Sequence, residues 1–339
     1  TNLLKPSKKK SQAKPLPRAK SRTVPPTGRS GARILVIVGP TASGKTSLGI
    51  KLAKKISAIG GPASGWQGAE IVSADSRQIY RGLDIGTAKP TLKERQTTPH
   101  HLIDVRYPNR SYTVAQYKRD CLKSIRQILN KNKLPIIVGG TGLYIKAVVH
   151  NLTVPRVMAD PLLRKELEQE LQDRGLAFLY NELIKLDPEA AYIVDPRNPR
   201  RVIRALEITL STKKTFSESR HQGKPLFNFL QIGINRPSEK LKERINKRID
   251  AMIATGLIEE VKNLIKKYPV KTTAFEAIGY REIISYLQKE TSLEEAVELM
   301  KKNSWRFAKR QMTWFRKEER IHWISTVKEA ENLTKHFLK

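Results

Sequence analysis

Residues 39–46 have the residue types and the spacing of a loop that binds phosphate. They are Gly39, Pro40, Thr41, Ala42, Ser43, Gly44, Lys45 and Thr46. The pattern Gly-x4-Gly-Lys-Thr arranges backbone N–H groups and a helix N-terminus around a diphosphate. Lys45 would add a positive charge, and the Thr46 hydroxyl could hold Mg²⁺. The loop by itself does not say whether the diphosphate belongs to a nucleotide.

A carboxylate follows a second apolar run of the sequence. Asp75 comes after the run at 70–74, whereas the run at 134–138 is followed by two glycines and Thr141. An ordinary NTPase would place an Asp for Mg²⁺ there, so Asp75 is the carboxylate expected nearest the loop. Two roles stay open for it, a general base on a substrate nucleophile or a group behind Mg²⁺ as in a kinase. The side chains of this segment that could read a base are Asp75, Ser76, Arg77 and Gln78.

The elements that must position these residues are strands alternating with helices. The run at 34–38 is apolar and β-branched, which is typical of a buried parallel strand, as are the two runs described above. A helical periodicity occupies 114–129. The alternation predicts an α/β fold with a parallel sheet, whose ligands lie at the carboxyl ends of the strands. We therefore expect Asp75, Thr141 and the phosphate loop to share one crevice.

The composition indicates a polyanionic partner. The chain has 339 residues with 64 Lys+Arg and 32 Asp+Glu, a formal net charge of +32. Such a surface concentrates phosphates. The single cysteine, Cys121, excludes an intramolecular disulfide and any metal site built on several thiolates. No apolar run approaches the roughly 18 residues of a membrane span, so we expect no membrane partner. We also expect a monomer in the cytoplasm.

The charge is concentrated at the beginning of the chain. Residues 1–30 contain nine Lys/Arg, five Pro and no acid, and the first carboxylate is Glu70. This composition predicts a disordered basic tail, because it cannot bury enough apolar surface to offset the entropy of ordering. The tail is either a phosphate-binding arm or a solvated extension. An acid-free basic leader also resembles a transit peptide, which leaves a plastid location as the alternative.

The rest of the chain divides into a core and an insert. Residues 31–155 and 228–339 are expected to form the core with its C-terminal helices, and residues 156–227 an inserted helical domain, because charged Leu-rich helical segments without a convincing strand occupy its centre. The strongest helix signal begins at Ser292, which opens a capping box with Glu295. Apolar residues then recur at three-four spacing to Phe315, and basic residues occupy the remaining surface.

The motifs taken together resemble the tRNA dimethylallyltransferase family, also called tRNA isopentenyltransferases. The phosphate loop is the first of several blocks that follow one another in the family's order from about residue 33 to 325. The others are 74–80 (ADSRQIY), 84–90 (DIGTAKP), 99–104 (PHHLID), 138–144 (VGGTGLY), 200–207 (RRVIRALE), 277–282 (AIGYRE) and 308–316 (AKRQMTWFR). The zinc finger at the C-terminus of eukaryotic members has no counterpart, which favours a bacterial or plastid type.

The resemblance implies a P-loop NTPase-like core with an inserted all-helical domain. It also implies transfer of a dimethylallyl group from dimethylallyl diphosphate to N6 of the adenosine 3′-adjacent to the anticodon. Asp75 would accept the N6 proton, Thr141 would contact the reacting centre, and Arg244 with Arg248 would complete the diphosphate site. The two arginines are four residues apart and share one helix face, although a solvated basic face is the alternative. The metal expected is Mg²⁺ on Thr46.

The anticodon stem-loop of tRNA is the partner that this resemblance implies. The residues expected to bind it are Asp75, Ser76, Arg77, Gln78, Thr141, Arg164, Arg200, Arg201, Arg204, Arg281, Lys309, Arg310 and Arg316. Trp305 and Trp314 lie off the apolar stripe of the last long helix and either stack on bases or pack in the core. For His100 and His101 we expect structural packing and not a metal site.

Two other functions stay open. An adenylate isopentenyltransferase, which modifies free AMP, ADP or ATP, resembles the core but lacks a full helical insert. A P-loop nucleotide kinase is disfavoured by the missing carboxylate after the run at 134–138. The insert and the basic run at 200–204 favour a macromolecular acceptor.

Overall fold

The computed structural model describes residues 31–60, 65–153, 160–212, 214–219 and 222–339. The expected tail at 1–30 and the first residues of the expected insert lie outside these ranges. Six strands form one sheet in the order β3-β2-β4-β1-β5-β6, and every pair is parallel. They are β1 (Arg33–Val38), β2 (Ala69–Ser73), β3 (His100–His101), β4 (Leu134–Gly139), β5 (Asn228–Ile234) and β6 (Ile321–Ile324). The predicted parallel α/β core is confirmed.

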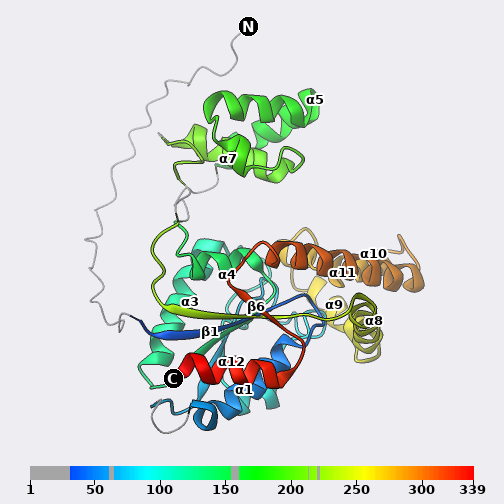
Figure 1. The fold of residues 1–339 in the computed structure, drawn as a ribbon. Coiled ribbons are helices and arrows are strands. Elements are labelled where there is room, and N and C mark those ends of the chain that lie inside the picture. Colours follow the sequence, from blue (N-terminus) through cyan, green and yellow to red (C-terminus); the bar gives the residue numbers. More distant parts are fainter. Residues whose placement is uncertain (1–30, 61–64, 154–159, 213, 220–221) are drawn as a thin grey trace.

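Helices cover both faces of the sheet, as the apolar strands require (Figure 1). On one face, α3 (Val114–Leu129) and α4 (Gly142–Val149) pack against the strands. On the other, α1 (Lys45–Gly60) and α12 (Val327–Leu338) do so. The strand β1 is buried on both sides, which is why its sequence is an unbroken apolar run and does not alternate.

A further group of helices packs around its own apolar cluster beyond the carboxyl edge of the sheet. It contains α8 (Ser238–Ala254), α9 (Leu257–Ile265), α10 (Tyr280–Leu287) and α11 (Leu293–Phe315), with a short 3-10 helix at Thr273–Glu276. The capping box predicted at Ser292 is present and begins α11. The chain reverses between α8 and α9 at Gly256, whose φ of 100° is left-handed and suits glycine.

The segment between β4 and β5 contains a helical lobe with a separate apolar cluster. Its helices are α5 (Pro161–Leu186), α6 (Ala190–Ile193) and α7 (Pro199–Ser211), and Figure 1 shows α5 and α7 apart from the sheet. Gly175, at a φ of 81°, breaks α5 into two parts. No strand occurs within residues 160–212. None of the described helices is both long and apolar enough to cross a bilayer.

Several short elements were missed because their sequence signals are weak. The strand β3 has two residues and β6 has four, and neither shows the apolar run that marks the central strands. The helix α12, which covers β1 at the end of the chain, was also not predicted. A short helix, α2 (Leu92–Thr97), carries a capping box at Thr91 that the sequence contains but that was not used.

Candidate functional site

The carboxyl ends of three neighbouring strands bring the predicted site residues together. The phosphate loop follows β1, Asp75 follows β2 and Thr141 follows β4. The backbone N–H of Thr141 donates to Ala74 O at 3.1 Å, and Thr141 Oγ1 accepts from the N–H of Ser76 at 3.0 Å. Asp75 and Thr141 are therefore tied to the same short stretch of backbone. The expected common crevice is present.

The Asp75 carboxylate is oriented by its own loop. Its Oδ1 accepts from the N–H of Arg77 at 2.8 Å and from the N–H of Gln78 at 3.4 Å. This arrangement is a side-chain turn typical of Asp at the beginning of a loop. It holds one carboxylate oxygen against the backbone, and Asp75 also lines the cavity described below.

Lys45 is enclosed in the phosphate loop. Its Nζ donates to Pro40 O at 2.6 Å. Burial lowers the pKa of Lys45 to about 7, against the opposing influence of Asp75 and with a further lowering from Arg248. A buried lysine with a lowered pKa takes up a proton more readily when an anion binds. The negative charge of the anion stabilises the ammonium form that burial disfavours.

Three arginines surround the loop. Arg244 Nε donates to Ala42 O at 2.8 Å, and Arg248 Nη1 lies 3.5 Å from Thr41 Oγ1. Burial also lowers the pKa of Arg248. Both arginines therefore contact the phosphate loop, and Arg244 is at the same time exposed to solvent. The third is Arg236, whose Nε donates to Ser43 O at 2.6 Å.

Sequence reasoning missed Arg236 and Gln311. Arg236 follows β5, so its place at the carboxyl edge of a parallel sheet was a usable signal. Gln311 is 7% exposed; its Oε1 accepts from the N–H of Thr41 at 2.8 Å, and its Nε2 donates to Gly140 O at 2.9 Å. It thus joins the phosphate loop to the loop after β4. A polar residue on the buried face of α11 was the signal.

A cavity of about 320 Å³ lies beside the phosphate loop. Its polar side contains Asp75, Thr141 and Arg248, beside Thr41 of the phosphate loop. Its apolar side is built by α8 and α11 from Ile245, Ile249, Met252 and Met300. The arrangement suits a ligand with an anionic end and a small apolar group, next to a carboxylate that can accept a proton.

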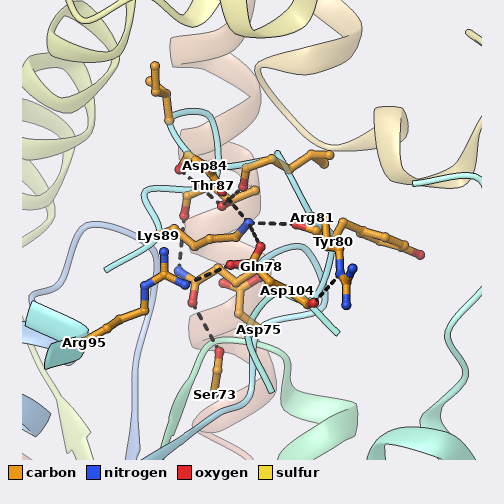
Figure 2. Close-up of polar contacts among 12 residues, drawn as sticks. Ser73, Asp75, Gln78, Tyr80, Arg81, Asp84, Thr87, Lys89, Arg95 and Asp104 are labelled. Atoms are coloured by element: carbon orange, nitrogen blue, oxygen red, sulfur yellow. Dashed lines mark hydrogen bonds and ion pairs between the residues drawn. The ribbon is translucent and has the colours of Figure 1, made fainter. Parts of the chain in front are cut away.

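Gln78 does not have the position expected of a residue that reads a base. Its side chain is 9% exposed. Its Oε1 accepts from Ser73 Oγ at 3.2 Å, and its Nε2 donates to the carbonyl oxygens of Thr87 and Ala88, both at 3.3 Å (Figure 2). Both amide hydrogens are used within the protein. This corrects the expectation that the Gln78 amide contacts RNA.

Two arginines expected to bind tRNA have partners inside the helical lobe. Arg164 Nη2 and Arg204 Nη1 donate to Glu207 Oε2 at 2.6 and 2.8 Å. Glu207 is buried, which raises its pKa, but the two guanidinium groups more than offset this and hold it below its ordinary value. Their contact with RNA stays a prediction, and both arginines stabilise the lobe.

The other predicted RNA contacts do not all line the cavity: Arg77, Arg281 and Arg310 do, whereas Arg201 and Lys309 line other hollows. Arg77 Nη1 donates to Thr273 O at 2.7 Å, and Arg200 of α7 lies 3.7 Å from Glu276. Both arginines therefore contact residues of the 3-10 helix at 273–276. The remaining predicted contacts are Ser76 in the loop after β2, Arg201 on α7, Arg281 on α10, Lys309 and Arg310 on α11, and Arg316 at its end.

The two histidines and two tryptophans take part in packing. His100 Nδ1 bonds to Thr98 O at 2.6 Å, and His101 Nε2 bonds to the Glu70 carboxylate at 2.7 Å. Trp305 and Trp314 are partly buried against the apolar clusters of the helical group and of the sheet. These contacts therefore show both tryptophans packed against the core.

The chain's own groups fit a metal brought by a substrate. Thr46 lies in the first turn of α1 and supplies one hydroxyl beside the loop. Among the described residues, no group of three or more His, Cys, Asp or Glu side chains could hold a metal ion. Mg²⁺ commonly takes only one or two protein ligands and completes its shell with phosphates and water.

Comparisons with known proteins agree with this geometry. Residues 78–318 match the IPP transferase family. A tRNA dimethylallyltransferase from Acetivibrio thermocellus is 48% identical over 296 residues, which cover 86% of this chain and 91% of that protein. The chain belongs to the IPP transferase family. The family's bacterial relatives do not support the plastid alternative.

Solved structures extend the likeness to the fold. The tRNA isopentenylpyrophosphate transferase from Bacillus halodurans has a TM-score of 0.66 and 38% identity, covering 90% of this chain and 96% of that one. A eukaryotic dimethylallyltransferase acting on tRNA has a TM-score of 0.71 and 28% identity, covering 87% and 74%. Both agree with a P-loop-like core that carries a helical insert.

Proposed function

We propose that this protein transfers the dimethylallyl group of dimethylallyl diphosphate to N6 of the adenosine 3′-adjacent to the anticodon in tRNA, with release of diphosphate. Family membership supports tRNA prenylation. The observation that carries the proposal is one cavity that is lined by Asp75 and Thr141, by Thr41 and Ala42 of the phosphate loop, and by apolar side chains of α8 and α11. Such a cavity can hold both the donor and an adenine amine.

The base side of the reaction belongs to Asp75. An exocyclic adenine amine is a weak nucleophile, so removing its proton as it attacks lowers the barrier. The bond from N6 to the dimethylallyl carbon forms while that carbon's bond to the diphosphate oxygen breaks. The electron pair leaves with diphosphate, and the N6 proton passes to the Asp75 carboxylate. Thr141, fixed by its bond from Ser76, lines the cavity at the same point.

The leaving-group side belongs to the phosphate loop and the arginines around it. Lys45, Arg244 and Arg248 supply positive charge where negative charge develops on the diphosphate. Arg236 braces the loop through Ser43 O. The Thr46 hydroxyl would hold Mg²⁺, which would supply further charge neutralisation there. Preorganised charge of this kind stabilises the transition state more than the bound substrate.

The acceptor must leave its stack to react. An adenine in an anticodon loop presents N6 to the cavity only after it swings out of the stacked bases. The net charge of +32 and the basic residues on α7 and α11 suit the phosphates of the surrounding stem. All of these groups come from one chain, so we propose that the protein acts as a monomer.

The two alternatives are less well supported. A nucleotide kinase would use a carboxylate after β4, where this chain has Gly139, Gly140 and Thr141. An adenylate isopentenyltransferase would not need the helical lobe of α5 to α7. Neither alternative explains the family match, which extends through that lobe.

One labelling experiment tests the proposal. The protein is incubated with Mg²⁺, radiolabelled dimethylallyl diphosphate and, in separate reactions, tRNA, AMP or ATP. We expect label in tRNA alone, at the adenosine next to the anticodon after nuclease digestion. Label in AMP or ATP would establish the adenylate enzyme, and the absence of label from every acceptor would refute prenyl transfer.

A further inference from the structure

A short segment, two of whose residues (Gly86 and Thr87) line the cavity, is held on two sides by hydrogen bonds. Residues 84–89 belong to the block 84–90 of the sequence. The backbone N–H groups of Asp84, Ile85 and Gly86 donate to the Glu260 carboxylate at 3.1, 2.7 and 3.2 Å. Tyr280 also donates to this carboxylate, at 2.5 Å. One side of the segment is thus fixed to α9 and α10.

The other side of the segment is fixed by a buried ammonium group. Lys89 is 2% exposed at its side chain. Its Nζ donates to Tyr80 O at 2.7 Å, to Asp84 at 2.5 Å and to Asp104 at 2.6 Å, so all three hydrogens are used (Figure 2). Arg95 pairs with the second oxygen of Asp104 at 2.8 Å. Two cations thus neutralise two carboxylates, and the group joins three loops.

Between these two anchors, the carbonyl oxygen of Thr87 links the side of the proposed base, Asp75, to the proposed diphosphate site. Thr87 O accepts from Gln78 Nε2 at 3.3 Å and from Arg248 Nη2 at 3.3 Å. Gln78 in turn donates its backbone N–H to the Asp75 carboxylate at 3.4 Å. A continuous line of contacts therefore leads from Asp75 through Gln78 and Thr87 to Arg248.

We propose that Gln78 and Lys89 are positioning residues that fix the Thr87 carbonyl and thereby set the placement of Asp75 relative to Arg248. This inference rests on the proposed function. Prenyl transfer needs the base and the diphosphate site at a fixed separation, because the attacked carbon lies between them. A carbonyl oxygen shared by Gln78 and Arg248 provides this separation. Positional errors of about 1 Å at such sites can reduce rates by about 100-fold.

The variant Gln78→Met tests the proposal most directly. It keeps the length of the side chain and removes the amide that donates to Thr87. We expect kcat for tRNA prenylation to fall by about 10- to 100-fold and the KM for dimethylallyl diphosphate to rise several-fold. The Kd for tRNA should stay within about twofold, because the amide does not face RNA. A raised tRNA Kd with an unchanged kcat would make Gln78 an RNA contact and overturn the proposal.

A double-variant cycle tests the shared carbonyl. If Gln78 acts on the donor site through Thr87 and Arg248, then Gln78→Met should not raise the donor KM further in an Arg248→Lys background. Independent, multiplying effects on the donor KM would overturn this coupling. The Kd for inorganic diphosphate is measured alongside, so the arrangement can be assessed without turnover.

Glu70→Gln is a matched control for Lys89→Met. Glu70→Gln removes the charge of another buried ion cluster, at the beginning of β2 and away from the cavity. Both variants should lower Tm, but only Lys89→Met should lower kcat per folded enzyme. Equal kcat in the two variants and the wild type would overturn the role of Lys89. If the wild type fails to label tRNA while Gln78→Met still weakens diphosphate binding, the proposed function fails and the positioning role stands.

Discussion

Buried ion clusters lie near both ends of β2, and the two clusters have opposite polarity. At the beginning of the strand, the Glu70 carboxylate is 1% exposed and bonds to His101, Lys131 and Lys133. Near the other end, the Lys89 ammonium is equally enclosed and meets carboxylates. The Glu70 cluster is anchored to the edge strand and to the turn before β4, whereas the Lys89 cluster joins the loops behind the cavity.

The comparison shows that burial and neutralisation of charge do not by themselves mark a functional site. What differs is the end of the parallel sheet. Loops that follow the carboxyl ends of parallel strands converge on one crevice, and the loops at the opposite end do not. The Lys89 cluster therefore acts on groups that reach substrates, whereas the Glu70 cluster can act only on stability.

The largest effect is expected at the cavity end, from Asp75→Asn. This change keeps the shape of the side chain and removes the base, so kcat should fall by about 10² to 10⁴-fold. The Kd for tRNA should change little, because the base acts in the transition state. Single-turnover transfer with saturating donor measures the effect. An unchanged rate would assign the proton to another group.

Thr46→Ala should have the next largest effect at the same end. The hydroxyl is the proposed protein ligand of Mg²⁺, and bonds to charged groups contribute about 1.5–3 kcal/mol. We therefore expect the KM for dimethylallyl diphosphate to rise by about 10- to 100-fold, since 1.4 kcal/mol corresponds to a factor of ten. The Mg²⁺ concentration needed for half-maximal activity should rise as well. A Mg²⁺ titration that matches the wild type would place the metal elsewhere.

The pH dependence of donor binding tests Lys45. Burial lowers the pKa of Lys45 to about 7, and a bound diphosphate favours the protonated amine. The Kd for inorganic diphosphate should therefore rise above pH 7, by up to about tenfold per pH unit. Calorimetry in buffers of different ionisation enthalpy should detect proton uptake on binding at pH 8. Lys45→Met should bind more weakly and show neither effect.

The smallest effect on activity is expected at the opposite end, from Glu70→Gln. Burial raises the pKa of Glu70, but hydrogen bonds from His101, Lys133 and Lys131 outweigh burial and lower this pKa from 4.5 to about 2. The charged carboxylate thus stabilises the fold above pH 4.5, and this contribution is lost as the pH falls towards 2. The variant should lose about 2 kcal/mol at pH 7 and keep kcat within about twofold.

The acid limb of the stability curve supplies the check on that prediction. The difference in Tm between the wild type and Glu70→Gln should shrink as the pH falls from 5 to 3, because the carboxyl of the unfolded wild-type chain takes up a proton below about pH 4.5, whereas the folded one does so only near pH 2. A difference that persists unchanged at pH 3 would mean that the lost charge is not its cause. A large loss of kcat in Glu70→Gln at pH 7 would contradict the prediction that only the cluster at the carboxyl end of β2 affects activity.

Much of the site was predictable because its chemistry is local in sequence. The phosphate loop, Asp75 and Thr141 each follow an apolar run that could only be a buried strand, and parallel strands align their carboxyl ends. The shared helix face of Arg244 and Arg248 was also predictable, because their i, i+4 spacing is local in sequence. Their roles in catalysis stay predictions until the variants above are measured.

The residues that sequence reasoning missed or misplaced are those whose partners lie far along the chain. Gln311 bonds to Thr41, 270 residues away, and Arg236 bonds to Ser43, 193 residues away. Gln78 is polar and follows Asp75 in a loop, so the sequence favoured an exposed role. Only the position of the segment 84–89 shows that its amide points inward.

The sequence by itself determined the strands of the sheet's centre, the phosphate loop and the beginning of α11, because apolar periodicity, glycine spacing and a capping box are properties of adjacent residues. The tertiary structure alone decided which face of α11 carries Gln311 into the site and which loops Lys89 joins. Those contacts depend on how helices and loops dock after the sheet has formed. Docking is set by the packing of many distant side chains together, and no short stretch of sequence contains that information.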